Sequence, residues 1–232
     1  MSADAASRMD QQYRYQRYVY DWSRKYYLLG REQILREIKL TSRQNLLEVG
    51  CGTGSNLYKL AYHFPLSKFY GLDASALMLE SARANTRYKR FQNIHFQQGL
   101  AQQFTAQQFN VANGFDHILM SYTLSMIPDW ELAVGNALQQ LKPGGCLHIV
   151  DFSDQVAMPG WFRHLLLKWL DWFHVRPNPE LPVFIRGLEQ QTGATVNIRH
   201  TPGRYALIIH CRKPGLDNEK HEEPQLPSCL KV

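Results

Sequence analysis

An α/β fold with a mostly parallel sheet is predicted by three features of this sequence. Apolar runs alternate with amphipathic stretches, a glycine-rich turn follows the first run, and an acidic residue ends the second. The apolar runs are typical of buried parallel strands and cover residues 45–50, 67–73, 93–98, 115–121 and 146–152. Stretches with helical periodicity lie between them, at 55–64, 76–85 and 130–141. This alternation predicts helices on both faces of the sheet.

Turn-forming residues mark the boundaries of the later elements. Pro128-Asp129 begins the helix at 130–141, and the sequence LKPGG ends it before the fifth strand. Thr201-Pro202-Gly203 joins two apolar runs as a hairpin, at 194–200 and 204–212. We therefore predict a helical N-terminal lid at 1–40, one domain at 41–213 with a helical insertion at 161–190, and a disordered tail at 214–232.

Composition limits the partners and the compartment. The chain has 232 residues and a net charge of +6, which favours anionic surfaces and anionic small molecules. The first residues lack the apolar core of a signal peptide, and no apolar run is long enough to span a membrane. Four scattered cysteines without metal spacing favour a reducing cytoplasm.

The turn LLEVGCGTG, residues 46–54, has its glycines at every second position: Gly50, Gly52 and Gly54. Dinucleotide enzymes need the spacing G-x-G-x-x-G, and a P-loop needs a following Lys-Ser/Thr, so both kinds of phosphate site are disfavoured. Glu48 precedes the turn and suits a cationic ligand, such as a sulfonium, better than a phosphate. Asp73 follows at the distance of a residue that binds a ribose diol.

The motif EVGCGTG, the strand end at Asp73 and the turn LKPGG together resemble the class I S-adenosylmethionine (SAM) methyltransferases. The resemblance covers residues 45–212 and implies a Rossmann-like seven-stranded sheet of order 3-2-1-4-5-7-6 with strand seven antiparallel. It implies that the glycine turn faces the methionine part of SAM, with Asp73 on the ribose and Ala74 near the adenine. The residues expected to bind SAM are Arg31, Glu48, Gly50, Gly52, Gly54, Asp73, Ala74, Ala101 and Ser121.

One position departs from this family pattern. Many members carry an acidic residue before the alanine that follows strand three, whereas this chain reads Gly99-Leu100-Ala101. The Leu100 side chain cannot accept a hydrogen bond from the adenine amine. We therefore expect that contact from the backbone near Ala101.

The N-terminal segment is rich in tyrosine and arginine and resembles the bacterial diacylglycerylhomoserine N-methyltransferases. The resemblance rests on Tyr13-Arg14-Tyr15, Tyr20-Asp21, Arg24-Lys25-Tyr26-Tyr27, Leu29-Gly30-Arg31 and the segment 121–130. It implies threefold, SAM-dependent methylation of the homoserine amine of a diacylglycerol ether lipid, which gives a betaine lipid. A partner enzyme that makes the homoserine lipid is implied as well.

The candidates for the acceptor side of the reaction are Tyr20, Tyr122 and Asp151. Methyl transfer mainly requires alignment of the reactants and exclusion of water, so no metal is expected. Tyr20 and Tyr122 could position the amine through oxygen contacts and cation–π attraction. Asp151 could attract an ammonium or be an ordinary carboxylate at a strand end, and no His/Asp pair is evident as a base.

The sequence of the aromatic stretch 161–175 fits both a segment that contacts a membrane and one that contacts protein. Its apolar positions recur at helical spacing, which suits either a helix in a membrane interface or a buried cap helix or dimer face.

The alternatives for the acceptor are another lipid amine, a quinone or a small molecule, and a SAM-binding protein without turnover is the non-enzymatic alternative. RNA methylation is disfavoured because no Asn/Asp-Pro-Pro-Tyr motif or RNA-binding appendage is evident, so we expect no nucleic-acid partner.

Overall fold

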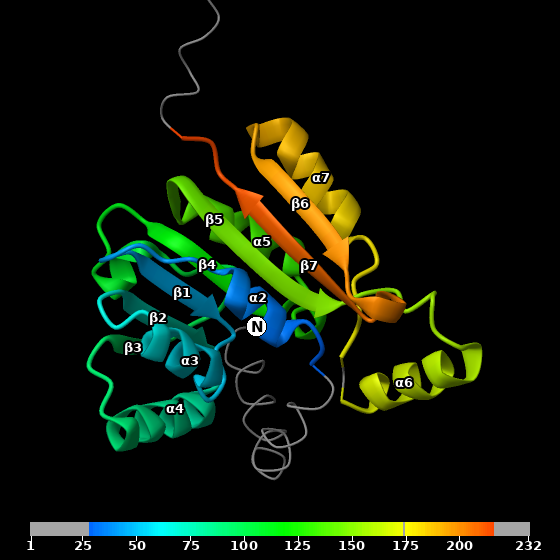
Figure 1. Cartoon of the computed structure of the whole chain (residues 1–232), viewed down its shortest axis with the longest axis horizontal. Helices are drawn as coiled ribbons and strands as arrows, with labels where there is room; N and C mark the ends of the chain where they lie inside the picture. The colour runs from blue at the N-terminus through cyan, green and yellow to red at the C-terminus, as the bar shows by residue number, and fades with distance from the viewer. Residues whose placement is uncertain (1–27, 174, 216–232) are drawn as a thin grey trace, which may run out of the picture.

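A seven-stranded sheet forms the centre of the computed structural model, which describes residues 28–173 and 175–215 (Figure 1). Its strand order is β3-β2-β1-β4-β5-β7-β6, and the first five strands are parallel. The strand β7 runs antiparallel to both β5 and β6. The predicted fold class is therefore confirmed, including the position and direction of the last strand.

The strands follow the predicted apolar runs closely, apart from the fifth. Their bounds are β1 (Asn45–Val49), β2 (Lys68–Asp73), β3 (Ile94–Gln98), β4 (Phe115–Ser121), β5 (Leu141–Phe152), β6 (Thr195–His200) and β7 (Ala206–Arg212). The strand β5 begins at Leu141 because this residue already pairs with Phe115, and a register shift separates that pair from the pair of His117 with Cys146. The LKPGG turn is therefore an irregular part of the strand rather than a loop before it.

The α-helices are α2 (Arg31–Glu37), α3 (Ser55–His63), α4 (Ala76–Lys89), α5 (Trp130–Gln139), α6 (Gly160–Trp172) and α7 (Leu181–Thr192). Short 3₁₀ turns are η1 (Ala106–Phe109), η2 (Leu124–Met126) and η3 (Pro202–Arg204). The helix α4 begins where the Ser75 hydroxyl accepts a hydrogen bond from the Met78 nitrogen, and it ends at Arg90, whose φ is 59°. It extends beyond the predicted residue 85, because helical periodicity reports the buried face and not the polar last turn.

Two hydrophobic cores lie on opposite faces of the sheet. Side chains of α2, α3, α4 and α6 pack on one face, where Ile34, Leu57, Leu79 and Leu170 join Leu119 and Val150 from the strands. Side chains of η1, α5 and α7 pack on the other face, where Phe109, Val134 and Ile185 meet Phe115 and Ile149. In this three-layer arrangement the α-helices of the described residues cover the two faces of the sheet, and α/β proteins bind ligands at the carboxyl ends of the parallel strands.

The chain leaves the carboxyl end of β5 to form α6, which projects from the rest of the molecule (Figure 1). Among the residues that the structure describes, no helix combines the length and the apolar character needed to cross a membrane.

Candidate functional site

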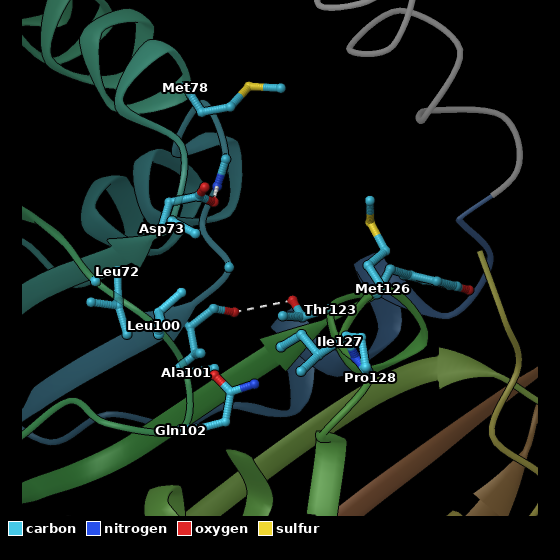
Figure 2. A pocket seen from close by; sticks show the side chains of 16 residues that line it. Leu72, Asp73, Met78, Leu100, Ala101, Gln102, Thr123, Met126, Ile127 and Pro128 are labelled. Atoms are coloured by element: carbon cyan, nitrogen blue, oxygen red, sulfur yellow. Dashed lines mark hydrogen bonds between the residues drawn. The ribbon is translucent and has the colours of Figure 1, made fainter. Parts of the chain in front are cut away.

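A pocket with an empty volume of about 870 Å³, part of it open to solvent, lies at the carboxyl ends of β1, β2 and β4. It is lined by Val49, Gly50, Gly52, Leu72, Asp73, Ala74, Met78, Gly99, Leu100, Ala101, Gln102, Tyr122, Thr123, Met126, Ile127 and Pro128. Figure 2 shows Asp73 and Met78 on one side of this pocket, with Met126 and Pro128 on the other. The lining is mostly apolar, so a few polar groups determine how a ligand is oriented.

The glycine turn after β1 has a backbone conformation that a side chain at Gly50 would disrupt. Gly50 has a φ of 71°, and a Cβ on it would lie 2.4 Å from Cγ2 of Thr123. The backbone nitrogens of Gly50 and Cys51 donate hydrogen bonds to the Leu72 carbonyl oxygen, at 2.7 and 3.0 Å. The Thr123 hydroxyl donates to the Val49 carbonyl at 3.1 Å, as the dashed line at Thr123 in Figure 2 shows. The turn is therefore fixed from both β2 and β4, and its backbone forms part of the pocket wall.

Asp73, at the end of β2, has both carboxylate oxygens engaged by the backbone. Oδ2 accepts a hydrogen bond from the Gly52 nitrogen at 2.7 Å, and Oδ1 accepts one from the Ser75 nitrogen at 2.9 Å. A carboxylate oxygen has more than one lone pair, so it can accept a hydrogen bond from a ligand hydroxyl in addition to one from the backbone. The carboxylate is buried and lines the pocket, so it is oriented before any ligand arrives.

The opposite wall is formed by the segment from Thr123 to Pro128, which includes η2. The buried carboxylate of Asp151 supports this segment by accepting hydrogen bonds from the Ser125 nitrogen at 3.1 Å and the Phe152 nitrogen at 2.8 Å. Burial raises the pKa of the Asp151 carboxyl, and the hydrogen bonds from Ser125 and Phe152 oppose that rise. Asp151 does not line the pocket, so the structure places it behind the wall.

Tyr122 lies where the pocket meets the N-terminal segment. Its backbone has a φ of 55°, and its nitrogen donates to the Val150 carbonyl at 2.7 Å. Its hydroxyl donates to the Leu29 carbonyl oxygen, and its ring contacts Phe152 edge-on with centroids 4.8 Å apart. Tyr122 also lines the pocket, so the segment before α2 is connected to the pocket through this side chain.

The structure places six of the predicted site residues in the lining of this pocket. The six that line the pocket are Gly50, Gly52, Asp73, Ala74, Ala101 and Tyr122. The described residues that do not line it are Arg31, Glu48, Gly54, Ser121 and Asp151. Tyr20 lies outside the described residues. The roles assigned to all of these residues stay predictions.

Three of the residues outside the pocket have other neighbours near the glycine turn. Glu48 is buried, and its Oε1 accepts a hydrogen bond from Asn56 Nδ2 at 2.6 Å. Gly54 has a φ of 79° before α3, where a Cβ would lie 2.8 Å from the Tyr58 hydroxyl oxygen. Arg31 is buried at the start of α2 and lines a separate cavity with Thr53 and Ser55. These positions connect the turn to α2 and α3.

Several pocket residues were not predicted from the sequence. They are Val49, Leu72, Met78, Gly99, Leu100, Gln102, Thr123, Met126, Ile127 and Pro128. The segment 121–130 carried part of the family resemblance, so its distinctive sequence was a signal for the wall at 123–128. Met78 and Gln102 had no comparable signal, because they reach the pocket only through the placement of α4 and of the loop after β3.

A cysteine–histidine group lies where β5 pairs with β7. One ligand atom each from Cys146, His148 and His210 lies within 4.8 Å of the others, which is a geometry that could hold a metal ion. His148 is hydrogen-bonded to His117 at 2.9 Å and to His210 at 2.8 Å. The expectation that the reaction needs no metal stays a prediction, and this group is not part of the pocket lining.

Residues 40–180 match the family described as methyltransferase domain. The chain belongs to this family. It is 32% identical over 104 residues to a trans-aconitate 2-methyltransferase of Deinococcus radiodurans, a match that covers 45% of this chain and 36% of that protein. It is 28% identical over 138 residues to a demethylmenaquinone methyltransferase of Listeria welshimeri, which covers 59% of this chain and 56% of that protein.

A solved structure shares the same fold. The SAM-dependent methyltransferase of Aquifex aeolicus superposes with a TM-score of 0.59 at 19% identity, covering 82% of this chain and 93% of that one. Family membership agrees with the methyltransferase domain expected from EVGCGTG. The two curated relatives named above match this chain over about a third and just over half of their own lengths, and they differ from each other in the acceptors named for them.

Proposed function

We propose that this protein is a SAM-dependent methyltransferase and that SAM binds in the pocket at the ends of β1, β2 and β4. The fit of the pocket to SAM is supported by the glycine turn, where Gly50 leaves no room for a Cβ and presents its backbone to the ligand. The oriented Asp73 carboxylate suits the two hydroxyls of a ribose. Leu72, Met78 and Leu100 provide apolar surfaces for an adenine ring.

The residues of this chain contribute alignment and exclusion of water. When bound, SAM supplies a methyl group on a cationic sulfur, and the acceptor must present a neutral amine in line with it. The glycine turn and Asp73 hold the cofactor side, while Tyr122 and the wall at Met126 and Ile127 form the acceptor side. The Tyr122 ring can stabilise the positive charge that arises on nitrogen. The buried Asp151 keeps the wall in position through Ser125.

For the acceptor, we propose the homoserine amine of diacylglycerylhomoserine, methylated to the betaine lipid. The supporting observation is the hydrogen bond from the Tyr122 hydroxyl to the Leu29 carbonyl. Leu29 belongs to the Leu29-Gly30-Arg31 part of the resemblance to diacylglycerylhomoserine N-methyltransferases, and Tyr122 belongs to the part at 121–130. Two segments that carry the resemblance therefore meet at one pocket, and we include in the proposal a partner enzyme that makes the homoserine lipid.

A quinone is the second candidate acceptor, because the chain is similar over 138 residues to a demethylmenaquinone methyltransferase. The apolar wall at Met126, Ile127 and Pro128 would suit the ring or the tail of a quinone equally well. A quinone would have to react as its reduced hydroquinone, whose electron-rich ring carbon attacks the methyl group and then loses its proton to give one product, whereas the amine gives a series of three. The number and mass of the products therefore separate the two candidates.

The test is incubation of the full chain with labelled SAM and with either diacylglycerylhomoserine or a demethylated quinone, reduced to its hydroquinone with dithionite, in mixed micelles. Lipid mass spectrometry should show mono-, di- and trimethylated amine products, and calorimetry should show SAM binding. Methylation of the quinone alone would overturn the proposed acceptor. SAM binding without methylation of either lipid would support a binding protein without turnover.

A further inference from the structure

The helix α6 has apolar side chains around most of its circumference, and the structure separates them into two faces. Leu166 and Leu170 are buried against the core on the α2 side of the sheet. Trp161, Leu165 and Trp172 are exposed by 73%, 61% and 74%. At 100° per residue these three fall, together with Lys168, within a sector of about 60° on the opposite side of the helix. We call this sector, residues 161, 165, 168 and 172, the outer face of α6.

Two tryptophans and a leucine on one face of a projecting helix are more than scattered surface apolar residues. Tryptophan is favoured at membrane–water interfaces because its ring is apolar and its N–H is polar. Lysine can extend its charged end to lipid headgroups while its alkyl chain covers apolar surface. The outer face therefore has the composition of a helix that lies in the plane of an interface.

The charge of the surrounding segment favours an anionic surface. Residues 160–178 contain the cations Arg163, Lys168 and Arg176 and a single acidic residue, Asp171. A second copy of this chain is a poorer occupant, because a symmetric contact would bring two Lys168 side chains together in an apolar interface. Such a pair of like charges is costly when it is desolvated. A lipid surface instead leaves Lys168 hydrated.

The segment that follows α6 is connected directly to the pocket wall. The Arg176 nitrogen donates to the Ser125 carbonyl at 2.8 Å, and Asn178 Nδ2 donates to the Leu124 carbonyl at 3.0 Å. Leu124 and Ser125 belong to η2, whose Met126 lines the pocket. A surface that binds α6 therefore lies close to the acceptor side of the pocket.

We propose that the outer face of α6 docks the protein on an anionic membrane surface and that this docking places the pocket next to the lipid. The proposal goes beyond methyl transfer and does not require it. Binding can be measured without cofactor or acceptor, so failure of the proposed reaction would leave this result unaffected.

The test uses the full chain and vesicles of phosphatidylcholine with and without phosphatidylglycerol, in a flotation assay. The triple variant Trp161→Gln, Leu165→Gln, Trp172→Gln should lower binding to the anionic vesicles by about tenfold or more, because interfacial binding scales with buried apolar area. The single variant Lys168→Gln should lower it by about fivefold on anionic vesicles and little on neutral ones. Brominated lipids should quench the tryptophan emission of the wild type and not that of the triple variant.

The matched control is the triple variant Leu66→Gln, Tyr88→Gln, Leu132→Gln, whose side chains are as exposed but lie outside α6. It should bind vesicles like the wild type. Retention of SAM binding and of the melting temperature in both triple variants separates docking from misfolding. Equal vesicle binding by the wild type and the α6 variant would overturn the proposal. So would a wild-type dimer that the α6 variant dissociates, or failure of the wild type to bind vesicles at all.

Discussion

The Asp73 carboxylate accepts a hydrogen bond from the Gly52 nitrogen at 2.7 Å, which connects the end of β2 to the middle of the glycine turn. Its other oxygen accepts one from the Ser75 nitrogen at the start of α4. One side chain therefore fixes two backbone segments at the pocket and is itself fixed by them. A ligand that binds this carboxylate benefits from an orientation that folding has already established.

Replacing Asp73 with alanine should lower the affinity for SAM by roughly 10- to 100-fold, since hydrogen bonds to a charged group contribute about 1.5–3 kcal/mol. Asp73→Asn should lose less, because its amide oxygen can still accept the hydrogen bond from Gly52. Isothermal calorimetry with SAM and with S-adenosylhomocysteine measures both. Unchanged affinity in Asp73→Ala would contradict the assignment of Asp73 to the ribose.

Gly50→Ala should destabilise the fold and weaken SAM binding. The new Cβ would lie 2.4 Å from Thr123 Cγ2, in a backbone with a φ of 71°, and we expect a loss of about 1–3 kcal/mol in the free energy of unfolding. The matched control is Gly135→Ala in α5, where a Cβ meets no heavy atom within 4 Å. That control should stabilise the protein by about 0.5–1 kcal/mol. Chemical denaturation of both variants measures the contrast, and equal effects would refute the steric argument.

Much of the fold could be predicted because its signals are local. The apolar run at 115–121 became β4 with the same bounds, and the hairpin around Thr201-Pro202-Gly203 became β6 and β7. The start of β5 could not be predicted, because Leu141 joins the strand only through its pairing with Phe115. The sequence also could not predict which face of α6 is buried. Helical spacing separates Trp161 from Leu166, but only the placement of the helix decides which of them is buried.

Part of the pocket lining could likewise be predicted from the sequence. Gly50, Gly52 and Asp73 line the pocket because the turn that contains the glycines and the strand end that contains Asp73 meet at one edge of the sheet. Glu48 was expected among the SAM-binding residues because its charge suits a sulfonium, and that role stays a prediction. In the structure its Oε1 accepts a hydrogen bond from Asn56 in α3. Asp151 likewise supports Ser125 from behind. Charge alone does not reveal the side of the sheet on which a residue lies.

Tyr122→Phe should mainly affect the acceptor side of the pocket. The substitution keeps the ring against Phe152 and removes the hydroxyl that donates to the Leu29 carbonyl. We expect a loss of about 1 kcal/mol in the free energy of unfolding. We also expect a KM for the lipid amine that rises several-fold while SAM affinity stays within about twofold. Steady-state kinetics with Tyr88→Phe as the exposed control checks this, and an unchanged KM would remove Tyr122 from the acceptor side.

The stability of the protein should fall as the pH falls from 6.5 towards 4. Burial lowers the pKa of His117 to about 4, and it also lowers the pKa of His148. Between pH 6.5 and 4 the unfolded chain binds protons at these histidines, whereas burial keeps the imidazoles neutral in the folded protein. Lowering the pH therefore favours unfolding. For His117 alone the lost stability at pH 4 is about 3 kcal/mol. The raised pKa of Asp151 acts in the opposite direction, since it lets the folded state bind a proton first.

Comparing the wild type with a variant of His117 isolates the contribution of this histidine to the pH dependence of stability. Denaturant unfolding of the wild type and of His117→Gln, at pH values from 4 to 7, should show a shallower pH dependence for the variant, because glutamine has no proton to take up. The matched control is the exposed His63→Gln, which should keep the slope of the wild type. Asp151 contributes equally to all three proteins and cancels in the comparison. Identical slopes for the wild type and His117→Gln would show that burial does not hold His117 neutral.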